Sequence, residues 1–150
     1  MRIHFNIGSN LGDRPAHICR AIVGLAAALP PGRLLLSDYF ESEPWGYVSP
    51  NSFLNRGVLY ISESDITPLD TLDIAQSIEA SIAPGMSHRN PDGSYRDRAI
   101  DIDIIDIDGI VMNTPRLVLP HPRAAQRPFV AIPMAELNQR AELEEAFTPQ

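Results

Sequence analysis

Four aspartates alternate with isoleucines in the segment RAIDIDIIDIDG, residues 98–109. In a β-strand alternate side chains share a face, so Asp101 and Asp103 would point the same way, roughly 6 to 7 Å apart. Two carboxylates this close repel each other and raise each other's pKa unless a cation lies between them. Mg²⁺ binds through one or two carboxylates, several waters and phosphate oxygens. The first pair therefore favours a magnesium site, although Asp-x-Asp is a short motif that needs support from its neighbours.

Asp106 and Asp108 have a simpler explanation. If the strand continues without a bulge, the double isoleucine at 104–105 shifts the alternation, and both side chains face away from the first pair. Asp108-Gly109 is typical of a hairpin turn, and Asp106 can be solvated beside it. We predict a structural role for this second pair.

The basic residues are all arginine, because the chain has no lysine, and half of the twelve lie between residues 89 and 127. This excludes a Schiff-base lysine and a P-loop lysine. Arginine binds phosphate through two parallel hydrogen bonds. A cation between carboxylates, with arginines and His121 around it, is typical of phosphoryl transfer. Any single arginine could instead be an ordinary solvated surface residue.

Aromatic residues indicate a second part of a possible site. Trp45, Phe53 and Phe129 occur with Asn55, whose amide offers both a donor and acceptors. A flat heterocycle stacked between rings and recognised by an amide would suit this set. The alternative is that Phe53 and Phe129 are ordinary core residues.

Hydrophobic periodicity predicts the elements that position these residues. Strands are expected at 3–7, 33–42, 53–63 and over the aspartates, with helices from Asp13 to about 29 and over 67–82. Ser64 or Asp65 is expected to begin the second helix. Residues 110–113 could return as a hairpin, 129–137 fit either a strand or a helix, and 141–150 fit a final helical turn. The order β-α-β-β-α-β with a C-terminal extension predicts an α+β ferredoxin-like sandwich with helices on one face. The polar segment 85–97 is typical of a mobile loop over a site.

Composition limits the class of protein. A chain of 150 residues predicts one domain over 1–150, and a net charge of −7 argues against nucleic acid as a partner. No segment resembles a signal peptide or a membrane span, so no membrane partner is expected. Cys19 lies in a helical pattern and is interpreted as a small core residue. One cysteine favours a reducing cytoplasm, and we expect a monomer.

Seven short motifs occur in a fixed order: IGSNLGDR (7–14), SEPWG (42–46), FLN (53–55), IE (78–79), RAIDIDII (98–105), LVLPHPR (117–123) and RPF (127–129). In these motifs the chain resembles the 6-hydroxymethyl-7,8-dihydropterin pyrophosphokinase family. The resemblance extends from residue 7 to about 137. The R-x-x-D-x-D and L-P-H-P-R elements, at this separation, are its most specific parts.

The resemblance implies a Mg²⁺-dependent enzyme of folate biosynthesis that transfers diphosphate from ATP to the hydroxymethyl group of a reduced pterin, releasing AMP. Asp101 and Asp103 would hold two Mg²⁺ ions. Phe53 and Phe129 would enclose the pterin ring and Asn55 would bind its edge. The remaining pterin contacts would come from Ser42, Glu43, Pro44 and Trp45. ATP would be bound by Gln76, Arg89, Arg98, Arg116, His121 and Arg127, of which Arg98, His121 and Arg127 would have catalytic roles.

One motif departs from the family pattern. Where members usually have Gly-Arg after the second helix, this chain has Gly85-Met86, two residues later than usual after Glu79. His88 and Arg89 are the candidates to replace the missing arginine, and Tyr95 stands where some members carry tryptophan. Two alternatives therefore stay open. One is a catalytically weak homologue that binds ATP or pterin, and the other is a ferredoxin-like binding module with a structural cation.

Overall fold

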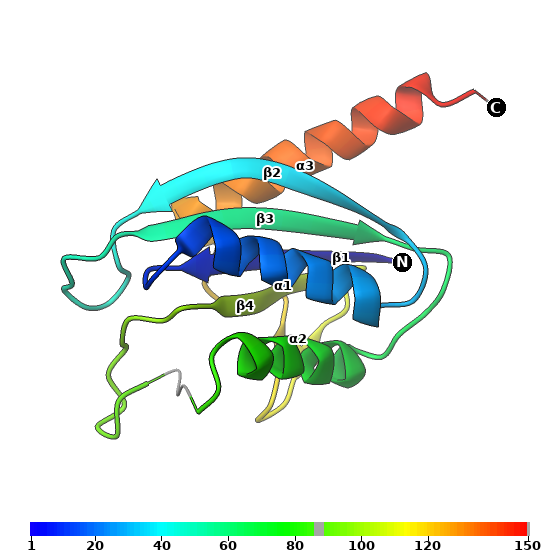
Figure 1. Ribbon diagram of the computed structural model, residues 1–150. Helices are drawn as coiled ribbons and strands as arrows, with labels where there is room; N and C mark the ends of the chain where they lie inside the picture. Colours follow the sequence, from blue (N-terminus) through cyan, green and yellow to red (C-terminus); the bar gives the residue numbers. More distant parts are fainter. Residues whose placement is uncertain (86–88, 150) are drawn as a thin grey trace.

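The computed structural model describes residues 1–85 and 89–149, and in these it shows a four-stranded antiparallel sheet and three α-helices. The strands are β1 (Arg2–Ser9), β2 (Arg33–Ser42), β3 (Phe53–Ile61) and β4 (Asp101–Ile107), in the spatial order β2-β3-β1-β4. Helices α1 (Arg14–Ala28) and α2 (Pro68–Ile82) cover one face, and α3 (Pro128–Phe147) crosses the other face behind β2 and β3 (Figure 1). This arrangement agrees with the predicted α+β class. The expectation of helices on one face holds only for α1 and α2.

Local sequence explains both helices of the first layer. Asp13 begins α1, as predicted, and its carboxylate accepts a hydrogen bond from the backbone N–H of Ala16 at 3.2 Å. The N-cap of α2 is Thr67, and not Ser64 or Asp65. The Thr67 hydroxyl accepts from the backbone N–H of Asp70 at 3.1 Å, which places Pro68 in the first turn, where its missing N–H costs nothing.

The main core lies between the sheet and these two helices. It is built largely from isoleucines, because alternate positions of β1 and β4 face α1 and α2. Its fully buried members include Ile3, Ile7, Ile18 and Ile107. A smaller cluster of Leu59, Leu137 and Ala141 lies on the opposite face, beneath α3. Cys19 is exposed, so its interpretation as a core residue was wrong.

A bulge in β4 changes the predicted orientation of the second aspartate pair. Asp103 lies opposite Asn6 of β1 and Asp106 lies opposite His4, with a register shift between the two rows. The shift absorbs one of the two adjacent isoleucines, so Asp106 keeps the same face as Asp103. The expectation for an unbulged strand was therefore wrong. The carboxylate of Asp106 accepts from the N–H of Gly109, and that of Asp108 from the N–H of Arg2, which agrees with a structural role.

The C-terminal third of the chain differs most from the expectation. β5 (Met112–Asn113) pairs with β6 (Val118–Leu119) and not with β4, so the predicted hairpin return of 110–113 onto the aspartate strand was wrong. A short 3₁₀ helix, η1 (Ala124–Gln126), precedes α3. The undecided segment 129–137 is helical, and α3 continues through most of the expected final turn.

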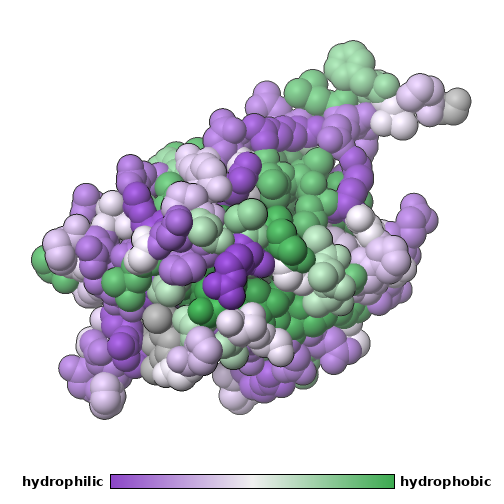
Figure 2. Space-filling view, viewed as in Figure 1, coloured by the Kyte–Doolittle hydropathy of each residue, from purple (hydrophilic) through white to green (hydrophobic). Residues whose placement is uncertain are grey.

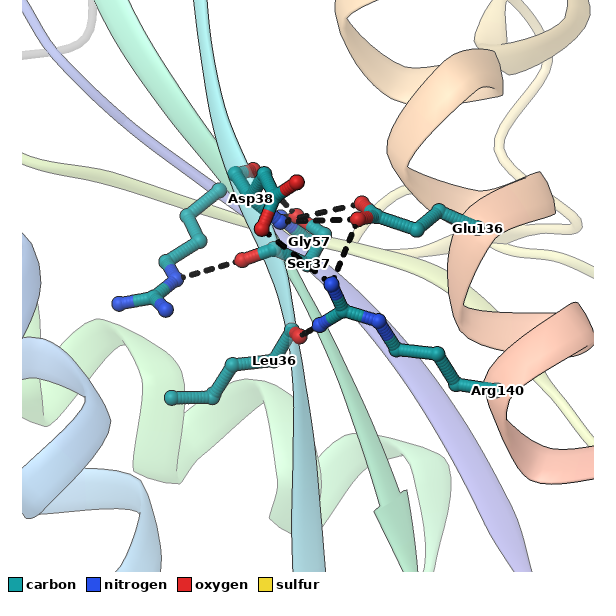
Figure 3. A network of polar contacts seen from close by, with 7 residues as sticks. Leu36, Ser37, Asp38, Gly57, Glu136 and Arg140 are labelled. Atoms are coloured by element: carbon teal, nitrogen blue, oxygen red, sulfur yellow. Dashed lines mark hydrogen bonds and ion pairs between the residues drawn. The ribbon is translucent and has the colours of Figure 1, made fainter. Parts of the chain in front are cut away.

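Helix α3 is fastened to β2 by a network of polar contacts (Figure 3). Residues 37 and 38 of β2 fall outside the regular pairing with β3, which leaves backbone groups to be satisfied from elsewhere. The N–H of Asp38 donates to the Glu136 carboxylate at 3.0 Å, and the Arg140 guanidinium donates to the carbonyl of Leu36. Arg140 also donates to Glu136 at 2.8 Å. These contacts fix the helix whose first turn carries Phe129.

Gly57 of β3 allows α3 to lie this close to the sheet. A Cβ at this position would lie 2.9 Å from Cβ of Pro133 and 3.0 Å from Cδ1 of Leu137. We expect Gly57→Ala to lower the free energy of unfolding by about 1–3 kcal/mol through overpacking, measured as a lower urea midpoint. Gly24→Ala is the comparison, because the three atoms nearest to its methyl would belong to the side chain of Ile78, and it should cost less. An unchanged midpoint for Gly57→Ala would mean that α3 is not held tightly here.

The far end of α3 extends beyond the sheet (Figure 1). Leu143 and Phe147 are exposed there, and hydrophobic residues stand out at this end in the space-filling view (Figure 2). Within residues 1–85 and 89–149, none of the helices combines the length and the apolar composition that a membrane span requires.

Candidate active site

The face of the sheet that α3 covers only in part carries two rows of small and polar residues. In the first row Asp101, Gly8 and Asn55 lie side by side on β4, β1 and β3. In the second row Asp103 and Asn6 lie beside Gly57. Both aspartates therefore share one face, as predicted from the alternation of β4.

An aromatic pocket lies above the first row. It is a hollow with about 480 Å³ of empty space, and it is partly open to solvent. Its lining residues are Asn6, Gly8, Ser42, Glu43, Trp45, Tyr47, Phe53, Asn55, Tyr95, Arg98, Asp101, Asp103, Arg127 and Phe129. Most of the predicted pterin contacts are thus brought together; Pro44 is not among the lining residues.

Two rings of this pocket contact each other and lie near one guanidinium. The centres of the Trp45 and Phe129 rings lie 6.5 Å apart at an interplanar angle of 62°, an edge-to-face contact. The guanidinium of Arg127 lies 5.5 Å from the Trp45 ring centre and 5.8 Å from that of Phe129. A Cβ at Gly8 would lie 3.4 Å from the Phe53 ring, so a glycine here keeps the floor beside that ring clear.

A polar pocket of about 750 Å³ adjoins the aromatic one at β4. It is lined by Leu72, Gln76, Glu79, Arg89, Tyr95, Arg98, Asp101, Ile102, Asp103, His121 and Arg127. Five residues line both pockets: Tyr95, Arg98, Asp101, Asp103 and Arg127. Asp101 and Asp103 therefore lie on the boundary between the aromatic pocket and the polar pocket.

The surroundings of the acidic groups at this boundary disfavour the ionised forms of Asp103 and Glu79. Burial, and next the charge of Asp101, raise the pKa of Asp103 well above its usual range, and the arginines only partly offset this. Arg98 pairs with Asp101 at 2.9 Å. Burial also raises the pKa of Glu79 to about 7, although its carboxylate accepts from the N–H of Ile102 at 2.9 Å. A bound cation would relieve the repulsion between these groups.

These raised pKa values predict how stability depends on pH without metal. Unfolded carboxyl groups titrate near pH 4, so as the pH rises the unfolded chain releases protons that folded Asp103 and Glu79 still hold. The contribution of these two carboxyl groups to stability is therefore fully present below about pH 4. It is lost as the pH rises through their raised pKa values in the folded state. In chemical denaturation from pH 4 to 8 with EDTA, Asp103→Asn should lose less stability than the wild type. Parallel curves would mean that Asp103 ionises normally.

The predicted arginines and histidine separate into two groups. Arg127 is 9% exposed and precedes α3, and its Nε has no partner among the described residues. His121 lies beside it, where burial, and next the charge of Arg127, lower the histidine pKa and keep it neutral. Arg89 stacks on Tyr95 with its guanidinium 4.5 Å from the ring centre. Arg116, however, pairs with Asp73 at the surface and does not line either pocket.

Of the residues at or near the position expected to carry a catalytic arginine, the structure describes only some. Met86 and His88 lie outside the described residues. Of the candidates to replace the arginine, Arg89 does line the polar pocket.

A partly buried network that holds the loop before β3 was missed by the sequence analysis. The carboxylate of Asp97 accepts from Asn10, Tyr47, Ser49 and Asn51 at distances of 2.8–2.9 Å. Asn10 also accepts from the backbone N–H of Arg98 at 2.7 Å. Burial opposes ionisation of Asp97, but these four donors outweigh it and lower the pKa. Only the density of polar residues in SPNS and GSN hinted at such a network.

Asp97→Ala should release residues 47–51 from the edge of the aromatic pocket. We expect the KM for the aromatic ligand to rise about 5- to 10-fold, or about 1 kcal/mol of lost preorganisation, with a smaller change in kcat. Faster limited proteolysis within 47–51 would confirm the cause. Asp92→Ala is the matched control, because Asp92 is exposed and its carboxylate accepts from the N–H and the hydroxyl of its neighbour Ser94. Equal KM values for the two variants would contradict the role of Asp97.

The fold and the pockets together define a small α+β protein with a two-part small-molecule site. A family model described as 7,8-dihydro-6-hydroxymethylpterin-pyrophosphokinase matches residues 4–139. A 2-amino-4-hydroxy-6-hydroxymethyldihydropteridine pyrophosphokinase of Porphyromonas gingivalis is 41% identical over 138 residues, covering 90% of this chain and 89% of that protein. Proteins of the same name from Methylorubrum extorquens and Bacillus subtilis are 33% and 30% identical, covering 91% and 92% of this chain and 82% and 78% of their own lengths. The chain belongs to the 7,8-dihydro-6-hydroxymethylpterin-pyrophosphokinase family, as the motifs indicated.

Proposed function

We propose that this protein transfers the diphosphoryl group of ATP to the hydroxymethyl group of 6-hydroxymethyl-7,8-dihydropterin, releasing AMP, in folate biosynthesis. The relatives' names support this activity. The observation that carries the proposal is that the aromatic pocket and the polar pocket adjoin at Asp101 and Asp103. A reaction between the alcohol of a flat heterocycle and a triphosphate needs two adjoining pockets, with the reacting atoms at the boundary between them.

The aromatic pocket would bind the pterin. Phe53 and Phe129 would enclose the ring, and Trp45 would close over it. Asn55 would bind the edge of the ring; its amide now donates to the carbonyl of Phe40 and to the Ser42 hydroxyl, which fixes its orientation. Backbone groups of residues 42–45, at the end of β2, would complete the contacts.

Asp101 and Asp103 would hold two Mg²⁺ ions. The described residues contain no group of three or more His, Cys, Asp or Glu that could hold a metal ion, and Mg²⁺ does not need one when phosphates and water complete its shell. The raised pKa of Asp103 fits this role, because a cation would favour the ionised form. Bound Mg²⁺ would neutralise phosphate oxygens and orient them for attack.

The cationic side would bind ATP. Gln76, Arg89 and His121 line it away from the aromatic pocket, whereas Arg98 and Arg127 line both. The pterin alcohol would attack the β-phosphorus while the bond to the α-phosphate oxygen breaks. Arg98 and Arg127 would stabilise the charge that develops there, and neutral His121 would donate a hydrogen bond. Arg116 would reach ATP only after releasing Asp73.

We further propose a ferredoxin-like framework, a single pyrophosphokinase domain over 1–150, a monomeric state and a cytoplasmic location. The strand order β2-β3-β1-β4, with α1 and α2 on one face, supports the framework. The match over 4–139 supports one functional unit. The single cysteine is compatible with a reducing compartment.

The deciding experiment measures AMP release from ATP and Mg²⁺, with and without 6-hydroxymethyl-7,8-dihydropterin. We expect AMP only when the pterin is present, in a one-to-one ratio with the diphosphorylated product. ATP binding without turnover would instead indicate a catalytically weak homologue, and no binding of ATP or pterin would indicate a binding module with a structural cation.

A further inference from the structure

Asn6 is a buried amide with no assigned function in the middle of the site. It lies on β1, the strand between β3 and β4, and it is 4% exposed. Its Oδ1 has no hydrogen-bond partner among the described residues, yet the side chain lines the aromatic pocket. A buried amide oxygen without a partner is destabilising, so its retention at a pocket wall requires an explanation.

The position of Asn6 relates it to both halves of the site. It lies directly opposite Asp103 of β4, and two residues along β1 from Gly8 on the same face. Gly8 in turn lies between Asp101 and Asn55. The distance across these three strands is roughly 10 Å, which a pterin with its hydroxymethyl arm can span. A ligand that spans this distance would lie over Gly8, with one edge bound to Asn55. Its reacting end would then reach the aspartates and lie beside Asn6.

We propose that Asn6 is a substrate-binding residue that holds the hydroxyl of the pterin hydroxymethyl group. This inference rests on the proposed function. The hydroxyl can donate to the amide oxygen or accept from the amide nitrogen, and rotation about χ2 of asparagine is soft, so either end of the side chain can meet it. The contact satisfies the buried amide only when substrate is present, and it fixes the hydroxyl beside Asp103. Asn6 thus selects for a hydroxylated arm, while Asn55 selects for the opposite edge of the ring.

The test compares two ligands, the hydroxymethyl pterin and 6-methyl-7,8-dihydropterin, which lacks only the hydroxyl oxygen. Dissociation constants are measured with Mg²⁺ and a non-transferable ATP analogue present, for the wild type and Asn6→Leu, a near-isosteric change. Loss of one neutral hydrogen bond predicts about 5- to 10-fold weaker binding of the hydroxymethyl pterin. Binding of the methyl pterin should change less than about 2-fold, because that ligand never made the bond. Asn6→Ala is measured alongside and decides the question if Asn6→Leu fails to fold.

His4→Leu is the matched control. His4 lies two residues earlier on the same face of β1, is also buried, and its Nδ1 also has no partner among the described residues. Like Asn6 it lines the space beneath α3, but unlike Asn6 it lines neither of the pockets described above. His4→Leu should therefore leave both dissociation constants unchanged. An equal loss for both pterins, or no loss for either, would overturn the proposal, whereas a wild type that binds pterins but releases no AMP would overturn the proposed function alone.

Discussion

Asp103→Ala is expected to lower pterin-dependent AMP release by roughly 100-fold or more while leaving the fold intact. The carboxylate lies at the boundary of both pockets, where phosphates and the pterin alcohol would meet. Asp101, which pairs with Arg98 at 2.9 Å, would then be the single remaining carboxylate of the pair for two ions. Stability should not fall, because burial and the charge of Asp101 disfavour ionised Asp103 in the free protein. The measurements are kcat with saturating Mg²⁺, ATP and pterin, and the urea midpoint.

Asp106→Ala is the matched control for this experiment. Asp106 lies on the same strand and on the same face as Asp103, but beyond the bulge, and it lines neither of the two described pockets. Its carboxylate bonds to the N–H of Gly109. Asp106→Ala should retain turnover and lose a little stability. If Asp103→Ala kept a rate near that of the wild type, the assignment of Mg²⁺ to this pair would be wrong.

Periodicity located most of the sheet and the first layer of helices from sequence alone. The predicted strand 33–42 coincides with β2, and the predicted helix over 67–82 differs from α2 by a single residue. These elements are predictable because each has one face toward the core, so apolar residues repeat at the period of the element. Asp101 and Asp103 of β4 were placed on one face correctly for the same reason, since Ile102 and Ile104 fix the buried face.

Features set by tertiary contacts were not predictable in this way. The double isoleucine at 104–105 fits either a shift of face or a bulge, and only pairing with β1 selects the bulge. α3 carries Pro133 in its interior, and Ile132 and Leu143 are exposed, so its pattern is not clearly helical. Thr67 and Ser64 are both acceptable N-caps, and the choice depends on where the helix meets the sheet.

The residues proposed to touch ligands were easier to find than those that hold them. Phe53 and Asn55 of β3 and Phe129 of α3 line one pocket, and chemistry and the family resemblance had grouped them. Asn10 and Asp97 were missed, because a polar residue in a turn or a loop has no periodicity, and its buried partners are distant in sequence. Asn6 was missed for a different reason. It occupies the polar position of an alternating strand, which ordinarily predicts solvent exposure.

Phe129→Ala is expected to weaken pterin binding about 10- to 100-fold while changing ATP binding less than about 3-fold. Stacking of a flat heterocycle on one aromatic ring contributes about 1–3 kcal/mol. Phe129 lines the aromatic pocket but not the polar one, and its ring contacts Trp45 at a centre distance of 6.5 Å. It does not belong to either buried core cluster, so truncation should remove ligand contact more than fold stability. The two dissociation constants are measured separately, ATP with Mg²⁺ alone and the pterin with a non-transferable ATP analogue.

The control for Phe129 lies on the same helix. Phe147 is 81% exposed at the opposite end of α3, so Phe147→Ala should leave both affinities unchanged. Equal weakening of ATP and pterin by Phe129→Ala would mean that the ring only shapes the start of α3, and with it the position of Arg127, which lines both pockets. Phe129→Leu separates these possibilities further, because leucine keeps most of the packing volume but cannot stack on the pterin. It should retain the stability of the wild type and still bind pterin several-fold more weakly.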